Sequence, residues 1–125
     1  MEKIKEAYCS KEVCELLKEK GFDIEIPTYI DKYGHIGYGS YWNWNQSSHT
    51  YSCPTHQMAC ALIRSKGYNI EIQATASGFI WSISKLNGTD VSWSNYTGPN
   101  DGGAWDDYDE CTDAALNYLL KVLSK

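Results

Sequence analysis

The sequence predicts an α+β fold in which two duplicated α-β-β units form one mostly antiparallel, four-stranded sheet. The main evidence is an internal repeat: residues 10–26 align with residues 56–72 at an offset of 46, and seven of the seventeen aligned positions are identical. Each copy has the pattern of an amphipathic helix, a glycine and an alternating strand, and a leucine-rich helix follows near the C-terminus. We expect the helices to cover one face of the sheet, because an apolar helix stripe must be buried against another element.

The first unit is expected to begin with a helix from about Ser10 to Lys20. Ser10 suits the N-cap position, because its hydroxyl can accept a hydrogen bond from a backbone N–H of the first turn. Gly21 suits the end of the helix, since glycine tolerates a positive φ. The alternating residues that follow predict strands over residues 23–26, 28–31 and 35–38. Pro27 lacks an N–H, so the first of these strands is expected at an edge or only as an approach to the sheet.

The second unit is expected to repeat this order, and the units cover about residues 8–51 and 54–106 of a single domain, residues 1–125. Its helix opens at residues 52–55, with Pro54 suited to the first turn, and runs to about Ser65. Gly67 ends that helix. Strands are expected over residues 68–74 and 79–84. A closing helix over about residues 109–123 completes the layout, with acidic residues at its positive N-terminal end.

Composition and charge exclude several classes of protein. The formal net charge is −5, which argues against binding of long nucleic acid, because such binding depends on a basic face. No apolar run approaches the roughly 20 residues of a membrane helix, so no membrane partner is expected. The N-terminus is charged and lacks the apolar segment of a signal peptide, which predicts a cytoplasmic location. The five cysteines are an odd number and are expected to be free thiols.

Two aromatic segments, residues 39–51 and 87–108, do not fit regular structure and are the best functional lead. Rings stack on planar ligands, while the interleaved amides and hydroxyls supply hydrogen bonds. Both segments follow the second strand of a unit, so we expect them to emerge at related places and to meet. The candidate ligand-binding residues in these segments are Tyr41, Trp42, Trp44, Trp93, Tyr96 and Trp105. The same residues would also suit an interface between copies, and a homo-oligomer is expected.

The start of the second helix supplies the remaining candidates. Backbone N–H groups near Thr55 and His56 can hold a phosphate or a carboxylate at the helix N-terminus, and Arg64 is a further candidate for an anion contact. The leading hypothesis is a non-enzymatic binding protein with no cofactor, no bound metal and no catalytic residue. Its ligand would be a small planar or nucleotide-like molecule or a protein surface.

The alternative is a small hydrolase or a zinc-dependent enzyme that uses Cys53 and His56. Cys53, His56 and Cys60 could supply three zinc ligands, or Cys53 could be a nucleophile whose pKa is lowered at the helix N-terminus. Against both, Cys60 is matched by Cys14 in the repeat, which indicates two equivalent small core residues. The acids between Asp101 and Asp113 lack the spacing of a calcium loop and are better explained by helix capping and dipole complementarity.

Two phrases resemble a protein family. They are Leu-Leu-Lys-Glu-Lys-Gly-Phe at residues 16–22 and Pro-Thr-His-Gln-Met-Ala at residues 54–59. With the leucine-rich last helix, they are similar to small proteins of Bacteroidetes and of their phages or mobile elements, over most of the chain. The long Gly/Asn/Asp segment before the last helix departs from that family. The resemblance implies no activity and no residue role. It implies an accessory factor that binds a host protein or a small signalling molecule.

Overall fold

The computed structural model describes residues 7–85, 92–95, 98–100 and 103–122, without the side chains of residues 92–95. In these ranges the chain is α+β, with three α-helices and six strands. The first unit consists of α1 (Lys11–Glu19), β1 (Glu25–Asp31), β2 (Ile36–Asn43), the short 3-10 helix η1 (Trp44–Gln46) and β3 (Thr50–Ser52). The second unit consists of α2 (His56–Ser65), β4 (Tyr68–Thr75), β5 (Gly78–Lys85) and β6 (Ser92–Asn95), and α3 (Tyr108–Val122) closes the chain.

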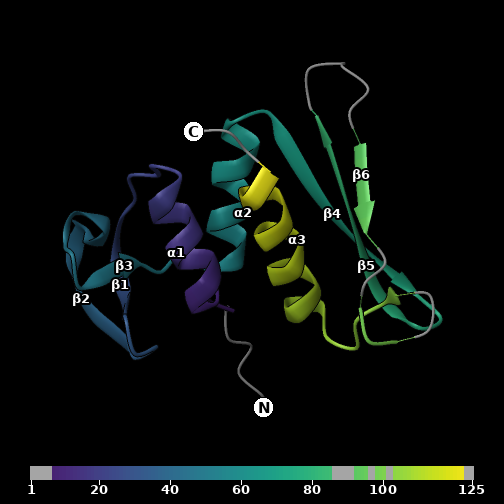
Figure 1. Ribbon diagram of the computed structural model, residues 1–125, viewed down its shortest axis with the longest axis horizontal. Coiled ribbons are helices and arrows are strands. Elements are labelled where there is room, and N and C mark those ends of the chain that lie inside the picture. The colour runs from purple at the N-terminus through teal and green to yellow at the C-terminus, as the bar shows by residue number, and fades with distance from the viewer. Residues whose placement is uncertain (1–6, 86–91, 96–97, 101–102, 123–125) are drawn as a thin grey trace, which may run out of the picture.

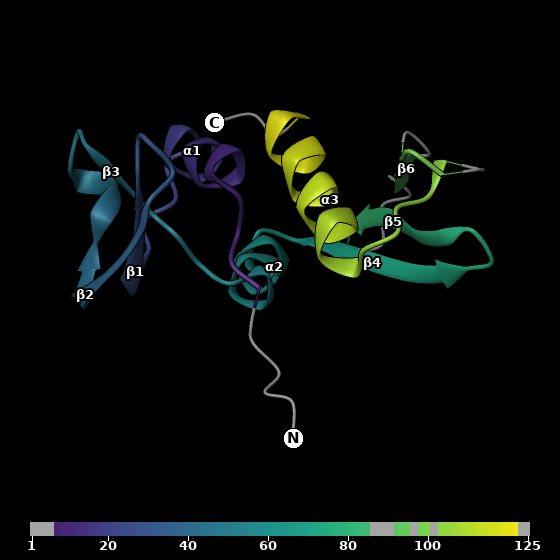
Figure 2. The ribbon, with the colours of Figure 1, turned by 90° about the horizontal axis from the view of Figure 1, so that it is seen from below.

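The expected single four-stranded sheet is wrong, because the strands form two separate antiparallel sheets. Their strand orders are β2-β1-β3 and β4-β5-β6. The sheets lie at opposite ends of the molecule, with the three helices between them (Figures 1 and 2). In each unit, a third strand forms in a segment for which the sequence pattern predicts no regular structure. β3 pairs with β1 on the side opposite β2, and β6 pairs with β5 on the side opposite β4. The helices therefore bury their apolar stripes against both the neighbouring helices and the sheets, and α3 contacts α1, α2, β4 and β5.

The helix ends largely follow the sequence pattern. Ser10 caps α1 and Thr55 caps α2, and each side chain accepts a hydrogen bond from the backbone N–H three residues on. Pro54 therefore precedes the helix instead of lying in its first turn. Gly21 and Gly67 follow the two C-caps with φ values of 82° and 93°, which glycine adopts without a steric penalty.

A short antiparallel bridge between Tyr8 and Thr55 joins the two helix starts. The backbone N–H of His56 donates to the carbonyl of Ala7 at 2.8 Å, and the third N–H of α2 donates to the Thr55 hydroxyl at 3.2 Å. The N–H groups of His56 and Met58 are therefore not free. The expectation that N–H groups near Thr55 and His56 hold an anion stays a prediction, and Gln57 is the first-turn residue to which it can still apply.

The core lies where the three helices meet. Its largest fully buried side chains are Leu17, Ile63, Ile83, Leu116, Leu119 and Leu120. The repeat predicts two equivalent core cysteines, but this holds for Cys14 alone, because Cys60 is only half-buried. In the described part of the chain, no helix combines the length and the apolar character needed to cross a membrane.

Candidate functional site

A pocket of about 390 Å³ runs along α2, between that helix, β4 and the start of α3. Ile70 and Ile72 of β4 form its apolar side, and polar groups line both of its ends. His56 and Asp109 lie at one end. Arg64 lies eight residues further along α2, a distance of about 12 Å at about 1.5 Å per residue. Both the volume and the mixture of an apolar wall with a few polar groups are typical of small-molecule sites.

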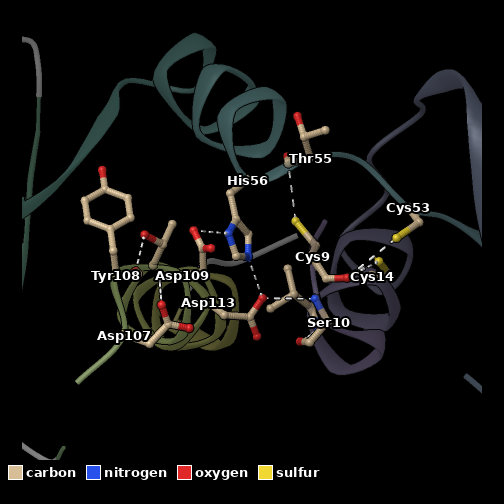
Figure 3. Close-up of polar contacts among 12 residues, drawn as sticks. Cys9, Ser10, Cys14, Cys53, Thr55, His56, Asp107, Tyr108, Asp109 and Asp113 are labelled. Carbon is tan, nitrogen blue, oxygen red and sulfur yellow. Dashed lines mark hydrogen bonds and ion pairs between the residues drawn. The ribbon is translucent and has the colours of Figure 1, made fainter. Parts of the chain in front are cut away.

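His56 is the centre of the polar contacts between α2 and α3, and its side chain points from α2 toward two carboxylates of α3 (Figure 3). Its Nε2 lies 3.0 Å from Oδ1 of Asp113, and that oxygen also accepts the Ser10 backbone N–H at 3.0 Å. Burial opposes ionisation of Asp113, but the hydrogen bonds from His56 and Ser10 outweigh it and hold the pKa of Asp113 below its usual range. A carboxylate only accepts hydrogen bonds, so Nε2 of His56 carries a proton.

The other ring nitrogen of His56, Nδ1, is buried and lacks a hydrogen-bond partner among the described residues. The nearest carboxylate oxygen, Oδ1 of Asp109, is 3.8 Å away, which is beyond hydrogen-bonding distance. In the neutral ring Nδ1 carries a lone pair, so two acceptors face each other across this gap. Because buried polar atoms without a partner are uncommon, the gap is a place where a donor from outside the chain would fit.

Arg64 occupies the opposite end of the pocket with its charge unpaired. Arg64 is exposed on the last turn of α2, and its guanidinium makes no hydrogen bond or ion pair with the described residues. A guanidinium presents a planar fork of donors that matches a carboxylate or a phosphate. Cys60 lies between the two ends, and burial raises the pKa of its thiol although Arg64 opposes that shift. The middle of the pocket is therefore uncharged.

The structure separates the predicted aromatic candidates. Tyr41 and Trp42 lie on β2, with 76% and 41% of their surface exposed. Trp105 is half-buried and forms a bridge with Phe79 of β5, and β5 belongs to the sheet at the other end of the molecule (Figure 1). The expectation that the two aromatic segments meet is wrong for these residues, because each segment follows its own sheet.

Two further aromatic candidates have no described side chain. Trp93 lies in β6 and is paired with Ile83 of β5, but the structure does not describe its side chain. Tyr96 lies outside the described residues. Their predicted role in ligand binding therefore stays a prediction.

Trp44 is part of the first sheet's own packing. Its ring lies 4.4 Å from the Tyr29 ring, centroid to centroid, and its Nε1 donates to the Ile26 carbonyl at 2.8 Å. A Cβ atom at Gly39 would lie 2.9 Å from the Trp44 ring, so the glycine makes room for it. These contacts satisfy the polar atom of Trp44 and hold its ring against β1 and β2.

Cys53 lies away from the pocket, in a buried group of thiols. It is fully buried, and its Sγ donates to the Cys9 carbonyl at 3.5 Å, as does the Cys14 thiol at 3.8 Å. A nucleophile must be reached by its substrate, and this thiol is not accessible. No group of three or more His, Cys, Asp or Glu side chains within the described ranges is arranged to hold a metal ion. The geometry thus gives the alternative enzyme hypothesis no support.

Three predicted residues do come together: Thr55, His56 and Arg64 all line the pocket. The sequence interpretation missed their partners on α3, Tyr108, Asp109 and Asp113. The available signal was the acidic start of the last helix, which the sequence pattern explains equally well by helix capping and dipole complementarity. His56 and Asp113 are 57 residues apart, and no periodic pattern links positions so distant.

Comparison of the chain with protein-family models, with curated proteins and with solved structures finds no significant match. The resemblance to the Bacteroidetes family therefore stays a prediction. The function is argued from the chemistry of the site itself.

Proposed function

We propose that the protein is a non-enzymatic binding protein that holds a nucleotide-like ligand in the pocket along α2. The observation that carries this proposal is the unpaired Arg64 guanidinium at one end of a partly apolar pocket whose other end is formed by acceptor groups. A ligand that fits this arrangement has an anionic group, an apolar or planar body and a hydrogen-bond donor at its far end. A nucleoside monophosphate has this order of groups.

The phosphate is assigned to Arg64. The chain carries a formal net charge of −5, and acidic residues of α3 border the other end of the pocket. Two charges of like sign repel, so an anionic group is favoured at Arg64 and disfavoured beside Asp109. A single phosphate needs only a local cation, in contrast to a long nucleic acid, which needs an extended basic face.

The planar part of the ligand is assigned to the middle of the pocket and to Tyr108. The Tyr108 ring is 51% exposed at the first turn of α3, and an edge-on contact with Phe79 at 5.5 Å holds it in place. An ordered aromatic ring beside Ile70 and Ile72 offers a surface on which a base can pack. Stacking on an aromatic side chain contributes on the order of 1–3 kcal/mol per base.

Isothermal titration with adenosine monophosphate, and with adenosine as the ligand without phosphate, tests the proposal. Replacing Arg64 by Gln is expected to weaken binding of the monophosphate about ten- to a hundredfold, which corresponds to about 1.5–3 kcal/mol for hydrogen bonds to a charged group. Adenosine is expected to bind the variant and the wild type alike. Lys66→Gln is the matched control, because it removes one exposed positive charge that does not line the pocket. Absence of nucleotide binding, or equal losses in the two variants, contradicts the proposal.

A second candidate function is binding of a protein, including another copy of this chain, through β2. Tyr38, Tyr41 and Trp42 expose 70%, 76% and 41% of their surface on that strand, and exposed aromatic residues favour interfaces. Light scattering measures this directly. If β2 joins two copies, a Tyr41→Ser and Trp42→Ser double variant becomes monomeric, whereas an unchanged mass removes this surface from consideration.

The enzyme alternative stays a separate proposal with its own test. It requires a catalytic role for Cys53 together with His56. Two measurements test this role: metal analysis of the purified protein, and thermal unfolding of the Cys53→Ser variant. Bound zinc that is lost in the variant would favour the enzyme over the binding protein.

A further inference from the structure

The end of the pocket opposite Arg64 is formed by two groups that accept hydrogen bonds, and it has a chemical preference of its own. We infer that His56 Nδ1 and the Asp109 carboxylate bind an exocyclic amino group of the ligand, so that the pocket selects nucleobases carrying such a group. This assignment rests on the proposed function, because it concerns the same pocket and names the class of base that it takes.

The first argument is the nature of the two groups. Asp113 accepts the Nε2 proton of His56 at 3.0 Å and so leaves Nδ1 as an acceptor in the neutral ring. Asp109 is a carboxylate and also accepts only. A ligand carbonyl brought to this place would meet two further acceptors and would be disfavoured, whereas a ligand N–H would satisfy both. Asp113 acts here as a positioning residue, because it sets the tautomer of His56 without contacting the ligand.

The second argument is the spacing of the two acceptors. Nδ1 of His56 and Oδ1 of Asp109 are 3.8 Å apart. One nitrogen atom placed beside that line can lie about 2.9 Å from each of them, the usual length of such a hydrogen bond. An amino group carries two hydrogens and can donate to both acceptors, while a hydroxyl carries only one. The gap therefore fits an amino group better than a hydroxyl.

Third, the two side chains differ in how freely they can move. The side chain of His56 is 12% exposed and is fixed by its contact with Asp113, whereas the side chain of Asp109 is 54% exposed. Asp109 can therefore move aside as the ligand enters and close on the amino group afterwards. Both residues also line a second, more acidic hollow at the start of α3, which favours a group with donor character over an anion.

The fourth argument is the distance between the two ends of the pocket. His56 and Arg64 are separated by two turns of α2, or about 12 Å. An α-amino acid has its amino and acidic groups on one carbon and cannot reach both ends. In a nucleotide, the base amino group and the phosphate lie at opposite ends of the molecule.

The test compares pairs of nucleotides that differ by the amino group alone. Adenosine monophosphate is compared with purine riboside monophosphate, and guanosine monophosphate with inosine monophosphate, by isothermal titration. At least one amino-bearing member is expected to bind about tenfold more tightly than its partner, the effect of one hydrogen bond to a charged group. In the Asp109→Ala variant, the ratio of the two affinities within that pair is expected to fall below about threefold, because the charged acceptor is lost.

Glu110→Ala is the matched control, since Glu110 is also an acidic residue of the first turn of α3 but does not line the pocket along α2. It is expected to keep the wild-type ratio. Equal affinities within both pairs, or a ratio that survives in Asp109→Ala, would overturn the amino-group assignment and leave the proposed function standing. If no nucleotide binds the wild-type protein, the proposed function fails and the assignment fails with it.

Discussion

Replacing Asp113 by Ala is expected to destabilise the fold more than any other single change of an acidic residue in α3. Asp113 is the point at which the three helices are joined by hydrogen bonds. It lies on α3, accepts from His56 of α2 at 3.0 Å, and accepts from the N-cap Ser10 of α1 at 3.0 Å (Figure 3). Only 23% of its side chain is exposed, so water replaces it poorly.

The magnitude follows from the two donors that the substitution leaves behind. The Ser10 N–H and the His56 Nε2–H each lose a charged partner in a partly buried place, and an unsatisfied buried donor costs about 1–3 kcal/mol. One of the two is expected to find water, so the total loss is about 1–3 kcal/mol of the free energy of unfolding. Asp109→Ala is the control. The Asp109 side chain is 54% exposed, and its loss is expected to change stability by no more than about 0.5 kcal/mol.

Urea unfolding followed by tryptophan fluorescence measures both variants, and acid titration adds an independent reading. The pKa of Asp113 is lowered in the folded state, so its ionised form stabilises the fold above the unfolded pKa of about 3.9, and that contribution is lost as the pH falls through the lower folded value. The stability difference between the wild type and Asp113→Asn is therefore expected to shrink below about pH 4. Equal destabilisation by Asp113→Ala and Asp109→Ala would refute the reasoning.

Other predictions concern packing and thiol access. Trp44→Ala is expected to destabilise the fold by about 2–4 kcal/mol in urea unfolding, because it removes a packed ring and a hydrogen bond, whereas the exposed Tyr41→Ala changes stability by less than about 0.5 kcal/mol. Comparable losses in the two variants would contradict the packing role of Trp44. Among the cysteines, Cys60 is expected to react first with a thiol reagent, since the other four are buried. Mass mapping that finds Cys53 modified first in the folded protein would contradict its burial.

The sequence predicted local structure better than strand partners. The helices were placed to within about two residues because apolar periodicity, the Ser10 cap and the following glycines are all local signals. The third strands were missed because Thr50–Ser52 and Ser92–Asn95 are short and have no apolar alternation. β1 also continues through Pro27, where the register with β2 shifts between Ile26 and Thr28. This shift in register accommodates the missing N–H of Pro27. The alternation of apolar and polar residues in the sequence does not reveal it.

The candidate site was predicted only in part, for the same physical reason. Thr55 is the N-cap of α2, and His56 and Arg64 lie on that helix, so all three belong to one continuous segment of the sequence. Their partner Asp113 is distant in the chain. It is one of several acidic residues near the start of the last helix, and such a composition is ordinary for a helix start, so the sequence does not single it out. The aromatic candidates were misjudged because ring content alone does not distinguish a packed Trp44 from an exposed Trp42.

The repeat places different surroundings around two equivalent cations, one in each unit. Lys18 and Arg64 are aligned positions of the repeat. Lys18 donates to the carbonyls of Ser47 and Thr50, between η1 and β3, because β3 pairs with β1 and packs beside α1. In the second unit the third strand pairs with β5 instead, on the side away from β4. Among the described residues no strand covers the groove between α2 and β4, and the Arg64 guanidinium has no carbonyl partner there. The different strand partner thus distinguishes Lys18, which binds carbonyls of its own unit, from Arg64, whose guanidinium does not.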